Sequence, residues 1–175
     1  MAVMDKTHLL FLALGTNLGD RRENLRRAVR ALAGLMVIEA ISPIYETAPW
    51  GLAEQPNFLN MCLSATTGLL PRPLLAKIKD LEIRLGRKPG PRWGPRLIDI
   101  DLLFYDDLIL QVEDAEGLTI PHPRLAERAF VLAPLADIAP QFRHPQTGLS
   151  AAQMAAAVDL TSARKLPEPL FREEG

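Results

Sequence analysis

The sequence predicts a single α+β domain, an antiparallel sheet with two helices packed on one of its faces. Three observations lead to this class. Apolar runs of strand length are separated by two stretches whose apolar residues recur at helical spacing. These segments follow the order strand, helix, strand, strand, helix, strand, which is the split βαβ or ferredoxin-like arrangement. The chain has 175 residues, of which 48% are hydrophobic, and this suffices for one core.

The first strand and the first helix are the clearest elements. Residues 9–14, LLFLAL, form a continuous apolar run typical of a central strand. Asp20 fits a helix N-cap, because Glu23 follows three residues later as in a capping box. Gly34 is expected to end this helix. Its apolar face is predicted to consist of Leu25, Ala28, Val29 and Leu32.

The middle of the chain is predicted to supply three more strands and the second helix. Residues 36–45 and 58–66 are apolar-rich and flank the turn-rich loop ETAPWGLAEQPN. The spacing predicts a helix over 73–85, closed by Gly86. The apolar stripe of this helix is Leu74, Ile78, Leu81 and Leu85. The last strand of the sheet is expected over 97–104, LIDIDLLF.

The rest of the chain is predicted to add a short hairpin and helices to the sheet. Residues 108–112, LILQV, follow a turn signal and fit a short hairpin return. A helical turn is expected over 124–130. Pro134 and Pro140 are expected to break the stretch that follows, because proline lacks the amide donor of a helix.

The C-terminal end is expected to contain a small helix and then a mobile tail. Ser150 is a candidate N-cap for an alanine-rich helix over 151–158. The final segment, RKLPEPLFREEG, is polar and contains prolines. We therefore expect one domain over residues 1–163 and a mobile tail over residues 164–175.

Composition narrows the classes of partner. The net charge of −1 gives no bulk attraction for nucleic acid or an anionic membrane surface. Cys62 is the single cysteine, so the chain has no internal disulfide, which suits a reducing cytosol. The apolar run near the N-terminus lacks both a basic start and the length of a membrane span. We therefore expect a cytoplasmic monomer with small-molecule substrates and neither a nucleic-acid nor a membrane partner.

One predicted strand contains two carboxylates inside its apolar run. Asp99 and Asp101 are two residues apart, so they share one face of the strand, while Ile100 takes the other. Two like charges this close repel one another unless they are neutralised. A solvated face with local ion pairs is one explanation. A site for Mg²⁺, which commonly binds one or two carboxylates together with substrate phosphates, is the other.

A cluster of basic residues favours the second explanation. Arg87, Lys88, Arg92 and Arg96 lie within ten residues of one another, just before the two carboxylates. Guanidinium groups beside paired carboxylates are typical of chemistry on a polyphosphate with a metal ion. The sequence has no Gly-x-x-x-x-Gly-Lys-[Ser/Thr] motif, so arginine side chains and metal would have to hold the phosphates. The Pro- and Gly-rich loop could close over substrate.

Several other polar or aromatic residues are ambiguous when taken singly. Asn60 interrupts an apolar strand, and Phe58 shares its face. Phe130 ends the predicted helical turn, and His122 lies between two prolines. A solvent-facing Asn60, two core phenylalanines and an ordinary loop histidine would explain each of them without any function.

Four motifs together carry a resemblance to a known family. They are ALGTNLGD, SPIYETAPWG with QPNFLN, GRKPGPRWGPRLIDIDLL and IPHPRLAERAFVLAPL, and they span residues 13–135. The chain resembles the 6-hydroxymethyl-7,8-dihydropterin pyrophosphokinases of folate biosynthesis. The resemblance implies a ferredoxin-like α+β fold and transfer of the pyrophosphoryl group of ATP to the pterin hydroxymethyl oxygen, with release of AMP.

The resemblance also implies roles for individual residues. Asp99 and Asp101 would hold two Mg²⁺ ions, one activating the pterin hydroxyl and one stabilising charge as AMP leaves. Arg87 and Arg96 match catalytic arginines of the family. The implied ATP-binding positions are Glu82, Arg92, Trp93, Leu102, His122 and Arg128. The implied pterin-binding positions are Thr47, Pro49, Trp50, Phe58, Asn60 and Phe130, with the phenylalanines stacking on the ring.

The chain departs from the family pattern at four positions. Pro89 stands where another arginine is common, which leaves Lys88 as the neighbouring charge in that loop. Lys79 stands where a glutamine is often found. Ala48 replaces a common proline, and Pro123 stands where some members have tyrosine. None of these changes touches the two aspartates or the two phenylalanines.

Two other functions fit the same element order. A palm-like nucleotidyltransferase or cyclase also places aspartates on such a sheet, but it would release pyrophosphate from a nucleoside triphosphate. An RNA-binding or amino-acid-sensing module of this topology would have no catalytic activity. The 6% aromatic content and the net charge of −1 disfavour RNA binding, and a sensing module has no use for paired aspartates beside four basic residues.

Overall fold

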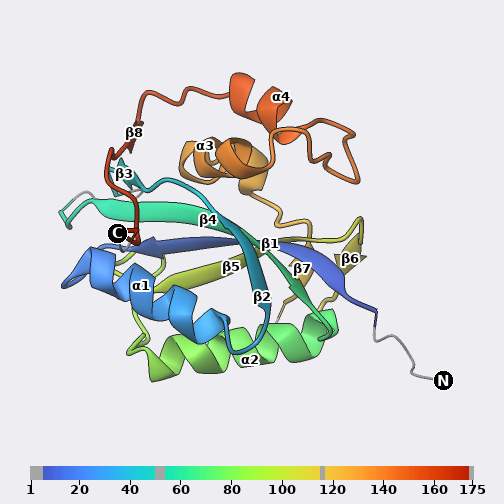
Figure 1. Ribbon diagram of the computed structural model, residues 1–175, viewed down its shortest axis with the longest axis horizontal. Coiled ribbons are helices and arrows are strands. Elements are labelled where there is room, and N and C mark those ends of the chain that lie inside the picture. The colour runs from blue at the N-terminus through green and yellow to red at the C-terminus, as the bar shows by residue number, and fades with distance from the viewer. Residues whose placement is uncertain (1–5, 50–53, 115–116, 174–175) are drawn as a thin grey trace.

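The computed structural model describes residues 6–49, 54–114 and 117–173 (Figure 1). Within them, six strands form one sheet in which all pairs are antiparallel. Its path runs β5-β1-β4-β3-β8, and β2 also pairs with β4. The strands are β1 (His8–Thr16), β2 (Val37–Ile41), β3 (Tyr45–Thr47), β4 (Phe58–Thr67), β5 (Asp99–Tyr105) and β8 (Ala163–Lys165).

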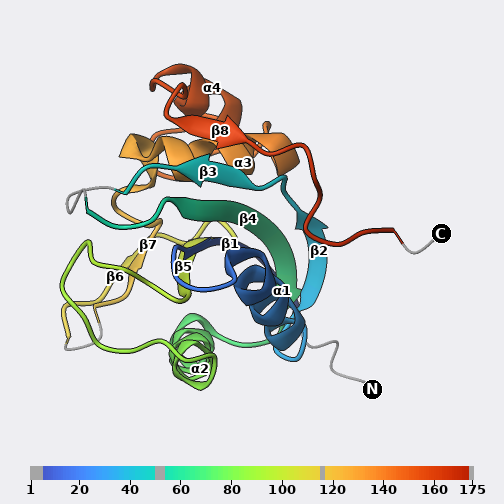
Figure 2. The same ribbon diagram turned by 90° about the vertical axis from the view of Figure 1, so that its left-hand side faces the viewer.

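Helices cover both faces of this sheet (Figures 1 and 2). The two helices expected from the sequence, α1 (Arg21–Leu32) and α2 (Pro71–Arg84), lie together on one face. The opposite face carries α3 (Ala129–Ile138) and α4 (Ala151–Ala156), preceded by the 3₁₀ turn η1 (Leu125–Glu127). A separate hairpin of β6 (Leu110–Gln111) and β7 (Thr119–Ile120) confirms the expected hairpin return.

The alternation of β1 divides the core into two parts. Leu10, Leu12 and Leu14 point toward α1 and α2, where they join a cluster with the apolar stripes of both helices. Phe11 points the other way and joins Phe104, Cys62 and the buried residues of α3 and α4. Cys62 is therefore a packed core residue, and burial raises the pKa of its thiol.

Capping residues in the sequence give the starts of α1 and α4 correctly. Asp20 is the N-cap of α1, and its carboxylate accepts a hydrogen bond of 3.0 Å from the Glu23 amide. Ser150 caps α4 in a full capping box with Gln153. Helix α2 begins two residues earlier than expected, at Pro71, because proline is well suited to the first helical position.

Two predictions about the continuity of an element were wrong. The single strand expected over 36–45 is two strands, because Pro43 has no amide to donate and Ser42 turns both its backbone and its hydroxyl to Cys62 of β4. The stretch after Phe130 is not broken at Pro134, which lies inside α3. The residues around it in α3 are buried, so packing against β4 outweighs the lost helical hydrogen bond.

The C-terminal segment makes contacts that its polar composition did not suggest. Residues 164 and 165 belong to β8, which pairs with β3, so the expected domain boundary falls inside a strand. Leu170 is 3% exposed and belongs to the core under α1. Within the described residues, no helix has both the length and the apolar character needed to cross a bilayer.

We expect Ser150→Ala to lower the free energy of unfolding by about 1 kcal/mol, because the first turn of α4 loses its side-chain cap. Chemical denaturation measures this loss. The matched control is Ser162→Ala, which alters an exposed serine in the loop that leads from α4 to β8. Equal stabilities of the two variants would contradict a role for the cap.

Candidate active site

Many of the residues singled out in the sequence line one pocket, which we call the central pocket. It lies on the α3 side of the sheet and has a volume of about 140 Å³. Strands β1, β3, β4 and β5, the start of α3 and the loop between α2 and β5 all contribute to it. Nine of the expected site residues line it: Thr47, Phe58, Asn60, Trp93, Arg96, Asp99, Asp101, Arg128 and Phe130.

The two aspartates share one face of β5, as predicted. Ile100 between them is buried in the cluster beneath α1 and α2. In the register with β1, Asp99 lies opposite Gly15 and Asp101 opposite Ala13, so the neighbouring strand presents almost no side chain to the pocket. A Cβ on Gly15 would stand 3.0 Å from Oδ1 of Asn60, which explains the glycine there.

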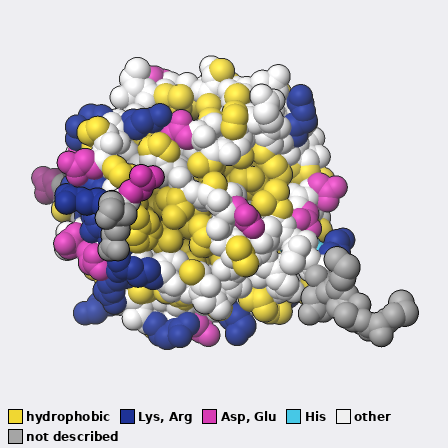
Figure 3. Space-filling model, in the orientation of Figure 1, with side chains coloured by type: hydrophobic (Ala, Val, Ile, Leu, Met, Phe, Trp, Pro, Cys, Tyr) yellow, Lys and Arg dark blue, Asp and Glu magenta, His cyan; other side chains and the backbone are white. Residues whose placement is uncertain are grey.

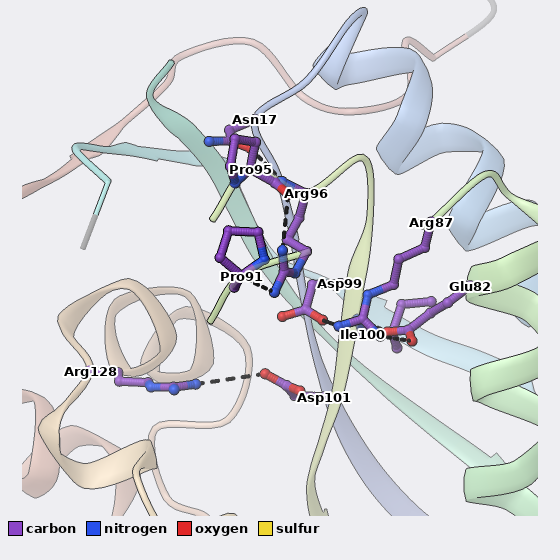
Figure 4. Close-up of polar contacts among 10 residues, drawn as sticks. All are labelled: Asn17, Glu82, Arg87, Pro91, Pro95, Arg96, Asp99, Ile100, Asp101 and Arg128. Atoms are coloured by element: carbon purple, nitrogen blue, oxygen red, sulfur yellow. Dashed lines mark hydrogen bonds and ion pairs between the residues drawn. The ribbon is translucent and has the colours of Figure 1, made fainter. Parts of the chain in front are cut away.

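Two arginines approach the carboxylates from opposite sides (Figure 4). Arg87 Nη2 is 3.3 Å from Asp99 Oδ1, and Arg128 Nη1 is 3.7 Å from Asp101 Oδ2. Burial raises the pKa of both aspartates, and the charge of Asp101 adds to the rise at Asp99, while the arginines oppose it. The pocket thus concentrates negative charge between two fixed positive groups.

Glu82 holds both the strand that carries the aspartates and the arginine beside Asp99. It lies on α2, is 3% exposed, and accepts a hydrogen bond of 2.6 Å from the backbone amide of Ile100. Its other oxygen accepts from Arg87 Nη1 at 3.2 Å. Because β5 is an edge strand, this carboxylate satisfies an amide that no neighbouring strand reaches. Burial raises the pKa of Glu82 to about 7.

Asn17, which sequence reasoning did not select, ties the loops around the pocket together. Its amide oxygen accepts from the Arg96 backbone amide at 2.8 Å, and its own backbone amide donates to the Arg96 carbonyl at 2.9 Å. Its side-chain nitrogen donates to Gln55 Oε1 and to the Pro56 carbonyl. The signal was present in the GTN motif, where a polar residue directly follows a central strand.

The arginine-bearing loop is folded tightly upon itself. Trp93 has a positive φ of 66°, and the guanidinium groups of Arg92 and Arg124 lie 5.0 Å and 4.8 Å from the centre of its ring. The guanidinium of Arg96 donates to the carbonyls of Pro91 and Pro95. These contacts hold Arg96 at the mouth of the pocket, beside Asp99 (Figure 4).

The other end of the pocket combines aromatic rings with an amide. Phe58 and Phe130 line it from β4 and from the start of α3. The nitrogen of the buried Asn60 side chain donates to the Thr47 hydroxyl at 2.7 Å. Arg128 connects the two ends, because its guanidinium lies 5.5 Å from the Phe130 ring while also facing Asp101. A flat polar ring and a charged group can therefore bind side by side.

Some expected site residues lie outside the pocket lining. The Leu102 side chain is buried beneath the helices, and Glu82 lies under β5. Arg92 is exposed on the loop, and Pro49 follows the lining residue Ala48. His122 lies near Arg128, and burial first, then that positive charge, lowers its pKa to about 4. Trp50 is outside the described residues.

Comparison with known proteins decides the family. Residues 11–140 match the family model described as 7,8-dihydro-6-hydroxymethylpterin-pyrophosphokinase, HPPK. The chain belongs to the HPPK family. The 2-amino-4-hydroxy-6-hydroxymethyldihydropteridine pyrophosphokinase of Aquifex aeolicus is 45% identical over 136 residues, which cover 78% of this chain and 83% of that relative. The Bacillus subtilis protein of the same name is 42% identical over 142 residues, or 80% and 83%.

HPPK membership makes the protein an enzyme, a pyrophosphokinase of folate biosynthesis. Some relatives are much longer: the Dictyostelium discoideum folic acid synthesis protein FOL1 is 41% identical, but this chain covers only 22% of it. Among solved structures, wild-type Plasmodium falciparum HPPK-DHPS with SDX-DHP superposes with a TM-score of 0.72 at 16% identity. That match covers 91% of this chain and 48% of the other, and it shows a shared fold.

The burial of Glu82 predicts a pH-dependent stability in the absence of metal and nucleotide. Its folded pKa of about 7 exceeds the ordinary value of 4.5, so its stabilising contribution is complete below pH 4.5 and is lost as the pH rises through about 7. Relative to Glu82→Gln, we expect the free energy of unfolding of the wild type to fall over this window, by at most about 1.4 kcal/mol per pH unit. Denaturant titrations between these pH values measure the difference, and parallel curves would contradict it.

Proposed function

We propose that this chain transfers the pyrophosphoryl group of ATP to the hydroxymethyl oxygen of 6-hydroxymethyl-7,8-dihydropterin, giving AMP and the pterin diphosphate. One observation carries the proposal beyond family membership. The carboxylates Asp99 and Asp101 line the same pocket as the aromatic pair Phe58 and Phe130. A site for charged phosphates and a site for a flat ring therefore adjoin, as a direct transfer between two substrates requires.

We propose that Asp99 and Asp101 hold two Mg²⁺ ions. The donor set fits, because Mg²⁺ commonly takes one or two carboxylates and completes its shell with water and phosphate oxygens. When bound, the ions would neutralise the phosphates and polarise the oxygens that react.

The nucleotide would bind between the arginines of the loop and those near α3. Arg87 and Arg96 would hold phosphate oxygens, together with Arg128. Within the described residues, Nε of Arg87 and Nε of Arg128 are buried and have no hydrogen-bond partner, so each has a donor left for an incoming oxygen. Arg92, Trp93 and His122 would border the rest of the nucleotide, with His122 neutral at physiological pH.

The surroundings of Leu102 and Glu82 indicate how each would contribute to nucleotide binding. The amide of Ile100 points away from β1 toward Glu82, and backbone groups alternate along a strand, so those of Leu102 face the same outer edge. Leu102 would therefore bind the nucleotide through its backbone. Glu82 would act indirectly, by fixing Ile100 and Arg87.

The pterin would lie between Phe58 and Phe130, with its polar edge toward Asn60. The Asn60 nitrogen donates one of its two N–H groups to Thr47, so its carbonyl oxygen would accept from the ring and its second N–H would donate to it. Pro49 directly follows the lining residue Ala48 and would border this end of the pocket. Trp50, the other expected pterin contact on this stretch of the sequence, is outside the described residues. Because Gly15 of β1 has no side chain, a ring in the pocket can lie close to the sheet.

We also propose that the fold is a ferredoxin-like variant and that the enzyme acts as a cytoplasmic monomer. The strand order supports the first point, since β5, β1, β4 and the broken strand β2/β3 follow the order of that fold. The second strand has been split, and β8 and the helices α3 and α4 have been added.

The reaction is tested by incubating the protein with ATP, Mg²⁺ and the pterin, and separating the nucleotides by chromatography. We expect AMP only when the pterin is present. Asp99→Asn and Asp101→Asn should each lower the rate of AMP formation by at least about a hundredfold, since the charge that offsets the metal is lost. The exposed Asp107 gives the matched control, and Asp107→Asn should keep the wild-type rate. Free pyrophosphate as the product would indicate a nucleotidyltransferase instead.

Phe130→Ala should weaken pterin binding by about 1–3 kcal/mol, because stacking and burial of the ring are lost. Calorimetric titration with the pterin and, separately, with a non-hydrolysable ATP analogue measures both affinities. Phe142→Ala is the control, because Phe142 packs on Phe11 and Phe104 outside the pocket. Equal losses for both ligands in Phe130→Ala would assign this residue to packing.

A further inference from the structure

The strand β3 forms one wall of the central pocket but is only three residues long, Tyr45–Thr47. Its inner neighbour is β4, and Thr47 bonds to Asn60 of that strand. Its outer neighbour is β8, with Thr47 opposite Ala163 and Tyr45 opposite Lys165. The wall that carries the proposed pterin contacts is therefore held on its outer side by the C-terminal end of the chain.

One face of this strand pair is fixed to α3 through Asp137. The Tyr45 hydroxyl donates to Asp137 Oδ2 at 2.5 Å, and Lys165 Nζ donates to Oδ1 at 3.2 Å. Lys165 also lies over the Tyr45 ring, 5.6 Å from its centre. Burial, followed by the hydrogen bond to Asp137, raises the pKa of Tyr45 to about 12, so the hydroxyl keeps its proton. Asp137 thus joins β3, β8 and α3, the helix that carries Phe130.

The other face is fixed through Glu46. Its carboxylate accepts from Arg164 of β8 at 2.5 Å and from Arg21 of α1 at 2.8 Å. Arg21 also donates to the carbonyl of Asn57, the residue directly before Phe58. The same carboxylate therefore connects the C-terminal segment to the start of the strand that supplies Phe58 and Asn60.

The segment is also anchored beyond β8. The Leu166 amide donates to the Ile44 carbonyl at 2.8 Å, and Leu170 is buried in the core. Arg26 of α1 donates to the Leu170 carbonyl at 2.8 Å, and Arg22 donates to the two carbonyls before it. In the space-filling view, basic and acidic side chains are interleaved at the end of the molecule where this segment crosses α1 (Figure 3).

We propose that residues 163–170 are a positioning element of the pterin site: they hold β3 against β4 and so fix Thr47 and Asn60. The inference rests on the proposed function of the pocket. Its main contributions are the backbone pairing and the burial of Leu170, because exposed ion pairs such as that of Arg164 contribute little by themselves. The carboxylate end of the pocket has no contact with this segment among the described interactions, so the effect is confined to the ring end.

Variants of the full-length enzyme test this role. The Leu166 amide faces β3, so by alternation the Arg164 amide does too, and Arg164→Pro removes that ladder bond. Asp137→Ala removes the side-chain link without touching the backbone. We expect each to raise the Kd for the pterin about tenfold and to change the Kd for a non-hydrolysable ATP analogue less than about twofold. Arg172→Pro, the same exchange beyond Leu170, should leave both constants unchanged. Equal loss of both affinities, or no loss in folded variants, would overturn the proposal.

Linkage provides a second measurement on the unmodified protein, which does not depend on any variant folding. If β8 pairing favours pterin binding, then pterin binding must stabilise β8 pairing to the same extent. Hydrogen exchange at the Leu166 amide should slow when pterin is added and stay unchanged with the ATP analogue. Unchanged exchange in a protein that binds pterin would overturn the positioning role alone, whereas a wild type that binds no pterin would overturn the proposed function as well.

Discussion

Two like-charged carboxylates, Asp99 and Asp101, on one face of the edge strand β5 are the constraint on which the rest of the site depends. Two arginines offset the repulsion between these carboxylates, and other residues fix the position of the strand. Arg87 and Arg128 bring opposite charge from two directions. Glu82 fixes the backbone between the aspartates, and Gly15 and Ala13 leave the neighbouring strand bare. Charge that is costly to bury is thereby kept in place for a cation and phosphates to neutralise.

The two faces of the sheet have different roles: one is filled by the hydrophobic core, and the other also carries the pocket. The face beneath α1 and α2 is filled by the leucines of β1 and the stripes of both helices. The opposite face is packed only under α3 and α4, and its other end forms the pocket. Reactive groups on β4 and β5 are therefore held by a rigid strand, while the arginines come from a loop that Asn17 ties to the sheet.

The two ends of the pocket are supported by different parts of the chain. The carboxylate end is supported by Glu82 of α2 and by Arg87 of the loop that follows this helix. The aromatic end is supported by the C-terminal segment, through β8 and Asp137. Arg128 is the residue common to both, because it faces Asp101 and the Phe130 ring. Perturbations of one support should therefore alter the binding of one substrate more than the other.

The sequence by itself determined what depends on near neighbours. Periodicity located α1 and α2, alternation placed Asp99 and Asp101 on one face, and local capping chemistry identified Asp20 and Ser150. The motifs also selected nine residues that line the pocket. Only the tertiary structure decided what depends on distant partners: that β8 pairs with β3, that Glu46 meets Arg164 across 118 residues, and that Pro134 remains in a helix. The reason is physical, since strand pairing and core packing are set by which surfaces meet in space, and no local spacing encodes that choice.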